Sequence, residues 1–136
     1  MERCPCCNAR LKEKLTCPRC QADLSALIAA GKVAEQSLAK AIQLWANKQG
    51  EQSIAALMLA LSLNKSSLAL RFRGYLIQQY YRKVLDLLAR KQLLSANQQL
   101  YKARRLLPYS AELQQLRTFT DYLLAKHHDD FLPSGT

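Results

Sequence analysis

The sequence is poor in the residues that interrupt helices. It contains four glycines and four prolines, and no proline stands between Pro18 and Pro108. Aromatic residues make up only 7% of the chain, whereas hydrophobic residues make up 49%. This composition excludes a collagen-like, disordered or turn-rich β protein and favours packed helices, because the abundant Leu, Ala, Gln, Lys and Arg are all good helix formers. A length of 136 residues allows one domain, or a small module joined to a larger one, and excludes a large multidomain enzyme.

Acidic residues and long apolar runs are also scarce. The chain has ten Asp and Glu and 20 Lys and Arg, which gives a net charge of +10. This charge predicts attraction to nucleic acid, anionic membranes or acidic protein surfaces. The longest unbroken apolar run covers residues 54–61, whereas a transmembrane helix needs about 20 residues. The first residues do not resemble an export signal either. We therefore expect a soluble, cytoplasmic protein without a transmembrane segment.

All five cysteines lie between residues 4 and 20, inside a short repeat. Residues 4–11 and 17–24 share the pattern C-P-x-C-polar-A-x-L. Two such turns that face each other complete a tetrahedral set of four thiolates, which predicts a metal site formed by Cys4, Cys7, Cys17 and Cys20. Zn²⁺ suits four soft thiolates best, and iron is the main alternative. Because four protein ligands leave no open position, we expect a structural metal rather than a catalytic one.

This part of the chain resembles the zinc ribbon and zinc-knuckle family, whose members carry paired C-P-x-C-G turns on a small β-hairpin. The resemblance implies a minimal, zinc-bound ribbon over residues 1–24. Asn8 and Gln21 stand where the family usually has Gly. Gln adopts a left-handed backbone less readily than Asn, so we expect a slight distortion of the second turn.

The odd cysteine is Cys6, at the variable position of the first turn. It is either a spare thiol or, next to Cys7, part of a thiol- or metal-based sensor that swaps ligands or becomes oxidised.

Apolar residues at helical spacing predict about five helices after the cysteines. The first covers residues 24–48, with Asp23 as N-cap and Gly50 as its end, and Gly31 inside it is either a weak point or a site of close packing. The second is centred on residues 54–61, and the third runs from the Ser66 cap to residue 91. A fourth runs from residue 93 to Pro108, and a fifth from Ser110 through Leu123.

The short connections predict antiparallel helical hairpins. The spacing of Ala96, Leu100, Ala103 and Pro108 resembles the second helix of a tetratricopeptide repeat, and an imperfect echo lies 43 residues earlier, at Ser53, Leu57, Ala60 and Lys65. The predicted fold class is thus mainly α. It comprises a zinc ribbon with a short β-hairpin over residues 1–24, a tetratricopeptide-like antiparallel bundle over 25–128, and a flexible tail over 129–136. A generic α-bundle is the alternative.

The positive charge is concentrated in residues 65–107, which hold ten basic residues and one acidic residue. These residues predict a partner-binding face, since Arg and Lys bind phosphates and carboxylates; a plain solvated surface is the alternative. The candidate residues are Arg71, Arg73, Arg82, Lys83, Arg90, Lys91, Lys102, Arg104 and Arg105, with Tyr75, Tyr81 and Tyr101 interleaved. The run from His127 to Asp130 suggests either a second metal site or a frayed helix end.

No enzymatic function is expected, because the chain has no readable catalytic triad, no phosphate-binding glycine loop and few carboxylates. The leading hypothesis is a non-enzymatic zinc-binding adaptor that binds a partner protein with an acidic surface through its ribbon and its helices. One alternative is association with nucleic acid through the basic helices, because zinc ribbons resemble modules of transcription and translation complexes. The other is the Cys6 sensor.

Overall fold

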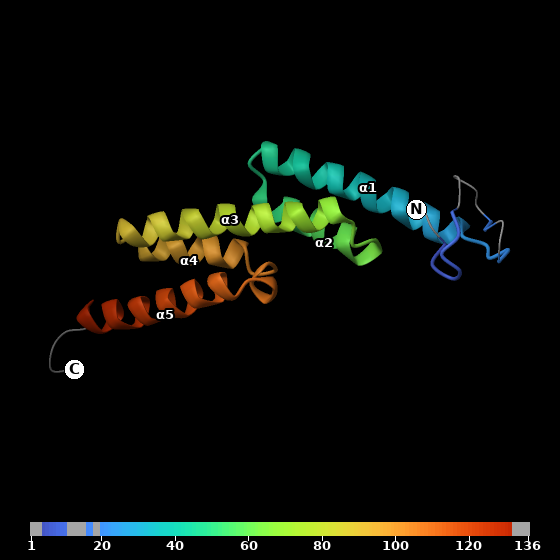
Figure 1. Ribbon diagram of the computed structural model, residues 1–136. Helices are drawn as coiled ribbons and strands as arrows, with labels where there is room; N and C mark the ends of the chain where they lie inside the picture. The colour runs from blue at the N-terminus through green and yellow to red at the C-terminus, as the bar shows by residue number, and fades with distance from the viewer. Residues whose placement is uncertain (1–3, 11–15, 18–19, 132–136) are drawn as a thin grey trace. The chain divides into compact units, whose positions relative to one another are not determined.

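The computed structural model describes residues 4–10, 16–17 and 20–131, and it describes side chains as far as Lys126. Five α-helices and one 3₁₀ turn follow one another in this part of the chain, which confirms a mainly helical protein (Figure 1). They are α1 (Ser25–Ala46), α2 (Gly50–Leu63), α3 (Ser67–Ala89), α4 (Leu93–Lys102), η1 (Leu107–Tyr109) and α5 (Ala111–Phe131). None of the helices described has both the length and the hydropathy that a membrane span requires.

The chain divides into two compact units, Met1–Ala69 and Leu70–Thr136. The division falls within α3 and not at residue 24, where the cysteine repeat placed the end of the predicted ribbon, and that boundary stays a prediction. Helix α5 continues through Phe131 and so passes residue 128, where we placed the end of the helical part. Residues 132–136, the rest of the predicted tail, lie outside the described residues.

In the first unit, α1 and α2 form a tightly packed hairpin. Small residues line the contact, and Ala41, Ser53 and Ala60 are almost completely buried. Two serine hydroxyls donate across it to backbone carbonyls: Ser53 Oγ to Ala41 O at 2.6 Å and Ser37 Oγ to Ala56 O at 2.8 Å. Hydroxyls that reach the opposite backbone require helices that approach closely, so these serines are satisfied packing residues rather than free polar groups.

A lysine in the left-handed conformation ends α1. Lys48 has φ of 62°, and Gln49 N–H donates to Leu44 O at 2.9 Å, as in a Schellman motif. Gly50, which we expected to end the helix, is instead the first residue of α2. The turn between α3 and α4 repeats this arrangement, since Lys91 has φ of 60° and Gln92 N–H donates to Leu87 O at 2.9 Å.

The second unit packs α3 against α4 and α5. Val84, Ala96 and Leu100 form a buried cluster, and partly buried Leu87, Leu88 and Leu116 pack against it. Helix α4 ends at Lys102, before the residue 108 that we predicted, and Pro108 lies in the separate 3₁₀ turn η1. The prediction was wrong because the backbone leaves the α-helical pattern before the proline: the N–H of Leu106 donates to Ala103 O at 2.8 Å and that of Tyr109 to Leu106 O at 3.0 Å, each only three residues back.

The helix starts follow the predicted capping residues in part. Ser66 Oγ accepts the N–H of Ala69 at 3.1 Å, and Ser110 Oγ accepts the N–H of Leu113 at 3.2 Å, so both serines cap as expected. Leu24, not Asp23, occupies the N-cap position of α1. The Asp23 carboxylate nevertheless accepts the N–H of Ser25 at 3.0 Å, and this bond lowers the pKa of Asp23.

Gly31 is not a site of close packing. Apart from the adjacent residues and the helix's own nearby backbone, no atom of the described residues lies within 4 Å of the position that a Cβ would take there, and the same holds for Gly74 in α3. Of the two explanations for Gly31, only a weak point in the helix is consistent with this open space.

Candidate metal centre

The described residues of the two C-P-x-C repeats make the same pattern of backbone hydrogen bonds. In the first, Asn8 N–H donates to Cys4 O at 2.8 Å, and Cys4 N–H donates to Ala9 O at 2.9 Å. In the second, Gln21 N–H donates to Cys17 O at 2.9 Å, and Cys17 N–H donates to Ala22 O at 3.0 Å. The sequence repeat therefore corresponds to a repeat of backbone hydrogen bonds around each cysteine pair.

Both turns need a left-handed residue directly after the second cysteine. Asn8 has φ of 62° and Gln21 has φ of 59°. Among the described residues of the second turn, no distortion of the kind we expected is seen, because Gln21 adopts nearly the same φ and makes the same hydrogen bond as Asn8. Gln21 therefore keeps the left-handed conformation, although this conformation is unfavourable for Gln.

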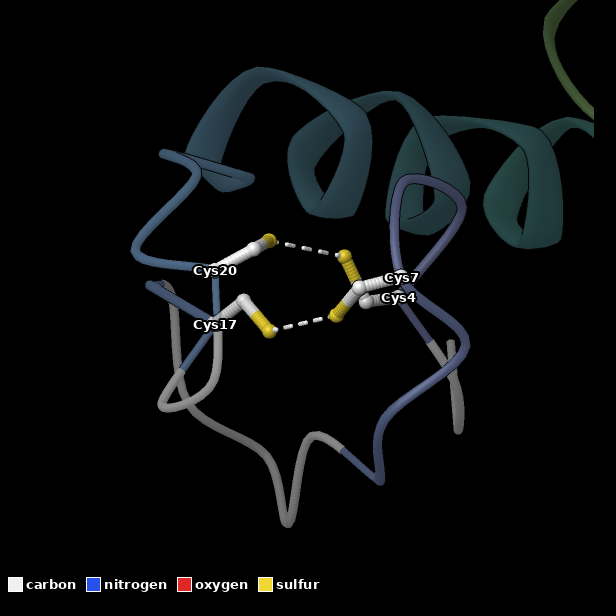
Figure 2. Close-up of side chains that lie close together, drawn as sticks. All are labelled: Cys4, Cys7, Cys17 and Cys20. Carbon is white, nitrogen blue, oxygen red and sulfur yellow. Dashed lines mark hydrogen bonds between the residues drawn. The ribbon is translucent and has the colours of Figure 1, made fainter.

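The four sulfur atoms converge between the two turns. Cys4 Sγ lies 3.6 Å from Cys20 Sγ, and Cys7 Sγ lies 3.5 Å from Cys17 Sγ, so each close pair joins one turn to the other (Figure 2). All four Sγ atoms lie within 4.8 Å of one another. A tetrahedral site with Zn–S bonds of about 2.3 Å has sulfurs about 3.8 Å apart, so the cluster has the dimensions that four-sulfur coordination requires.

The cluster is continuous with the beginning of α1. Cys4 and Cys17 are 2% and 0% exposed and form a small core with Leu24, against which Ile28 of α1 packs. Leu24 is the last residue of the second copy of the sequence repeat, and this repeated position could have indicated that it packs on the cysteines. The spacing gave no such indication for Ile28. The metal site and the first turn of the first helix therefore share one apolar core.

The thiols of the cluster differ in their affinity for protons. For Cys20, the backbone N–H of Ala22 favours the thiolate, but desolvation and the three neighbouring thiols outweigh it and raise the pKa to about 12. For Cys4, desolvation opposes ionisation, yet hydrogen bonds from the N–H groups of Cys7 and Cys6 lower the pKa overall. Four thiolates this close repel one another strongly, so a divalent cation is needed to hold the fully ionised set.

Cys6 lies beside the cluster without joining it. Its side chain is exposed, and its backbone N–H donates to Cys4 Sγ at 3.4 Å. Repulsion from Cys4 and, next, desolvation raise the pKa of the Cys6 thiol. In the metal-free chain, a raised pKa lowers the fraction of reactive thiolate, and the sensor hypothesis stays a prediction.

The nine basic candidate residues lie on more than one side of the second unit. Eight are exposed and Arg73 is half-buried. Arg71 and Arg82 are eleven residues apart on α3, which places them on one helix face. Arg90 pairs with Asp86 at 3.3 Å, and Lys102, Arg104 and Arg105 lie at or just after the end of α4. Their binding role stays a prediction.

Two arginines contact tyrosine rings. Arg73 lies 4.2 Å from the centre of the Tyr109 ring, and Arg104 lies 4.4 Å from that of Tyr101. Sequence reasoning missed Tyr109, because its partner Arg73 is remote along the chain and no periodicity relates the two. The side chains from His127 to Asp130 lie outside the described residues, and the metal site suggested there stays untested.

Comparisons with protein-family models, with curated proteins and with solved structures found no match to this chain. The structure itself defines the class as a mainly helical protein with a four-cysteine cluster, compatible with a zinc knuckle, at its N-terminal end.

Proposed function

We propose that this chain is a non-enzymatic zinc-binding adaptor. The observation that carries the proposal is the convergence of four Sγ atoms within 4.8 Å on two turns of the same structure. Cys4, Cys7, Cys17 and Cys20 would hold Zn²⁺, with iron as the alternative occupant, and the metal would supply folding energy to the N-terminal module. With four protein sulfurs, the site offers no position for a substrate, which favours a structural role.

The repeated helical hairpins support the adaptor role. The turns at Lys48 and Lys91 share one hydrogen-bond pattern, and Leu57 and Leu100, the residues that correspond at the 43-residue offset, are both buried. This agreement favours tetratricopeptide-like repeats, which present long surfaces to partner proteins. A zinc ribbon with a short hairpin fits the N-terminal end, where Thr16 and Asp23 form an antiparallel bridge.

The test of the metal site is metal analysis of the purified chain. We expect one Zn²⁺ per chain, loss of the metal in Cys17→Ser, and full occupancy in Cys6→Ser, because Cys17 is one of the four cysteines whose sulfurs form the cluster, whereas Cys6 is exposed and is not one of them. The Cys6 variant is the matched control, since it removes the same atom type from the same segment. Loss of zinc in Cys6→Ser would contradict the ligand set.

The test of the adaptor role is capture of partners by the tagged chain. A specific partner should be recovered in stoichiometric amount by the wild type and by Cys6→Ser, and in reduced amount by Cys17→Ser if the metal module takes part. Failure to enrich any protein above an unrelated basic helical control would count against the adaptor role while leaving the metal site unaffected.

A further inference from the structure

The basic segment around the end of α4 combines charge with exposed aromatic rings. No acidic residue occurs between Asp86 and Glu112, whereas Lys102, Arg104 and Arg105 follow one another closely. Tyr101 and Tyr109, which flank this run, are 64% and 53% exposed. Two exposed aromatic rings within the same short segment as three cations offer both stacking surfaces and positive charge.

Two contacts within the second unit pair an arginine with each of these tyrosines, which lie eight residues apart in the chain. Arg73 of α3 lies over the Tyr109 ring of η1, and Arg104 lies over the Tyr101 ring of α4. Arg104 is also held by the bond from its Nη1 to Tyr101 O at 3.0 Å. We name this set the Arg–Tyr patch: Arg73, Tyr101, Lys102, Arg104, Arg105 and Tyr109. It leaves out Arg90, whose charge is offset by Asp86.

We propose that the Arg–Tyr patch binds single-stranded nucleic acid, a function that goes beyond the adaptor role. Phosphates supply the charge that the cations need, and unpaired bases supply flat π-faces that stack on tyrosine rings and arginine guanidinium planes. An acidic protein surface would satisfy the cations but leave the exposed rings without a matching partner. A duplex would hide its bases from stacking.

The patch also predicts which basic residues would contact a bound strand. Arg71 and Arg82 share a face of α3 on which Tyr75 stacks with Phe72, the ring centres being 6.2 Å apart. The stacks of Arg73 on Tyr109 and of Arg104 on Tyr101 involve η1 and α4. A bound strand would therefore follow the connection from α4 to α5 rather than the length of α3.

The experiment measures fluorescence anisotropy of a labelled oligouridine of about 15 nucleotides, a length that covers a typical single-strand site. Arg104→Glu/Arg105→Glu should weaken binding about tenfold or more and lower the slope of log affinity against log salt by about one. Arg71→Glu/Arg82→Glu is the matched control, because it changes the net charge equally, and it should weaken binding much less. Circular dichroism checks that both variants keep their helices.

A second pair of variants tests stacking. Tyr101→Ala and Tyr109→Ala should each weaken binding about tenfold without a change in salt slope. Tyr122→Ala on α5, where the tyrosine is 60% exposed, is the control and should have no effect.

Four results would overturn the proposal: no binding by the wild type, equal losses in the two double-charge variants, equal behaviour of Tyr101→Ala, Tyr109→Ala and Tyr122→Ala, or equal affinity for polyglutamate or duplex DNA. Metal analysis does not depend on any of these binding measurements. Failure of the nucleic-acid proposal can therefore be told apart from failure of the zinc site.

Discussion

Asn8 and Gln21 occupy equivalent positions in the two metal-binding turns, and both adopt a conformation that suits glycine. For a residue with a Cβ, the left-handed region costs about 1–2 kcal/mol, and Asn is partly exempt because its short side chain can form local hydrogen bonds. Gln lacks this advantage. The second turn therefore carries more backbone strain than the first, although the two look alike.

Replacement of these residues by glycine should relieve unequal amounts of strain. We expect Gln21→Gly to stabilise the zinc-bound fold by about 1 kcal/mol and to tighten apparent zinc affinity about fivefold. Asn8→Gly should have a smaller effect. Competition with a chromophoric chelator measures both, and a larger gain in Asn8→Gly would contradict this account.

The raised pKa of Cys20, about 12, makes zinc binding depend on pH. In the metal-free chain this thiol keeps its proton at neutral pH, so binding must release it. Apparent zinc affinity should consequently rise from about pH 6 to about pH 8 and fall on acidification. Calorimetry in two buffers with different ionisation enthalpies should detect at least one released proton, and a binding enthalpy that does not depend on the buffer would refute the proton release.

At the scale of the helices, sequence periodicity predicted which helices form and their order along the chain. It predicted the residues at which they end less accurately. The apolar spacing predicted one buried stripe along α3, of which four residues are buried, Leu87 is partly buried and Leu68 is 60% exposed; the buried four are Phe72, Leu76, Tyr80 and Val84. The ends of α1 and α4 were misplaced because Gly50 and Pro108 are strong local signals, whereas a left-handed lysine carries no compositional mark. Schellman turns at Lys48 and Lys91 depend on hydrogen bonds that residue type alone does not reveal.

Gly31 and Gly74 offer a test of helix α1 and helix α3. Both lie inside helices beside open space, so Gly31→Ala and Gly74→Ala should each stabilise the protein by about 0.5–1 kcal/mol through reduced entropy of the unfolded chain. Urea unfolding measures the change. Destabilisation of either variant would show that another surface approaches that glycine in solution.

At the scale of the whole molecule, the main question is how far the metal supports the fold. Leu24 and Ile28 connect the cysteine core to α1, while the α1–α2 hairpin and the α3–α4–α5 unit have buried residues of their own. The metal core is small, so its loss should remove only the structure in direct contact with it.

Chelation should therefore unfold the N-terminal module and fray the start of α1, and it should leave most of the helical circular dichroism signal. Hydrogen exchange should show lost protection near Ile28 and retained protection in α2 and α4, and Cys17→Ser should reproduce this state without a chelator. Collapse of most of the helical signal would mean that the metal core nucleates the whole first unit.

The amino-acid sequence by itself determined the four-cysteine set, the mainly helical class and the order of the helices, because ligand spacing and apolar periodicity are local properties of the chain. Tertiary structure decided that Ile28 packs on the cysteine core and that Arg73 meets Tyr109. It also left open space at Gly31. These outcomes depend on which surfaces meet after the helices fold back, and contacts between residues distant along the chain leave no periodic trace in the sequence.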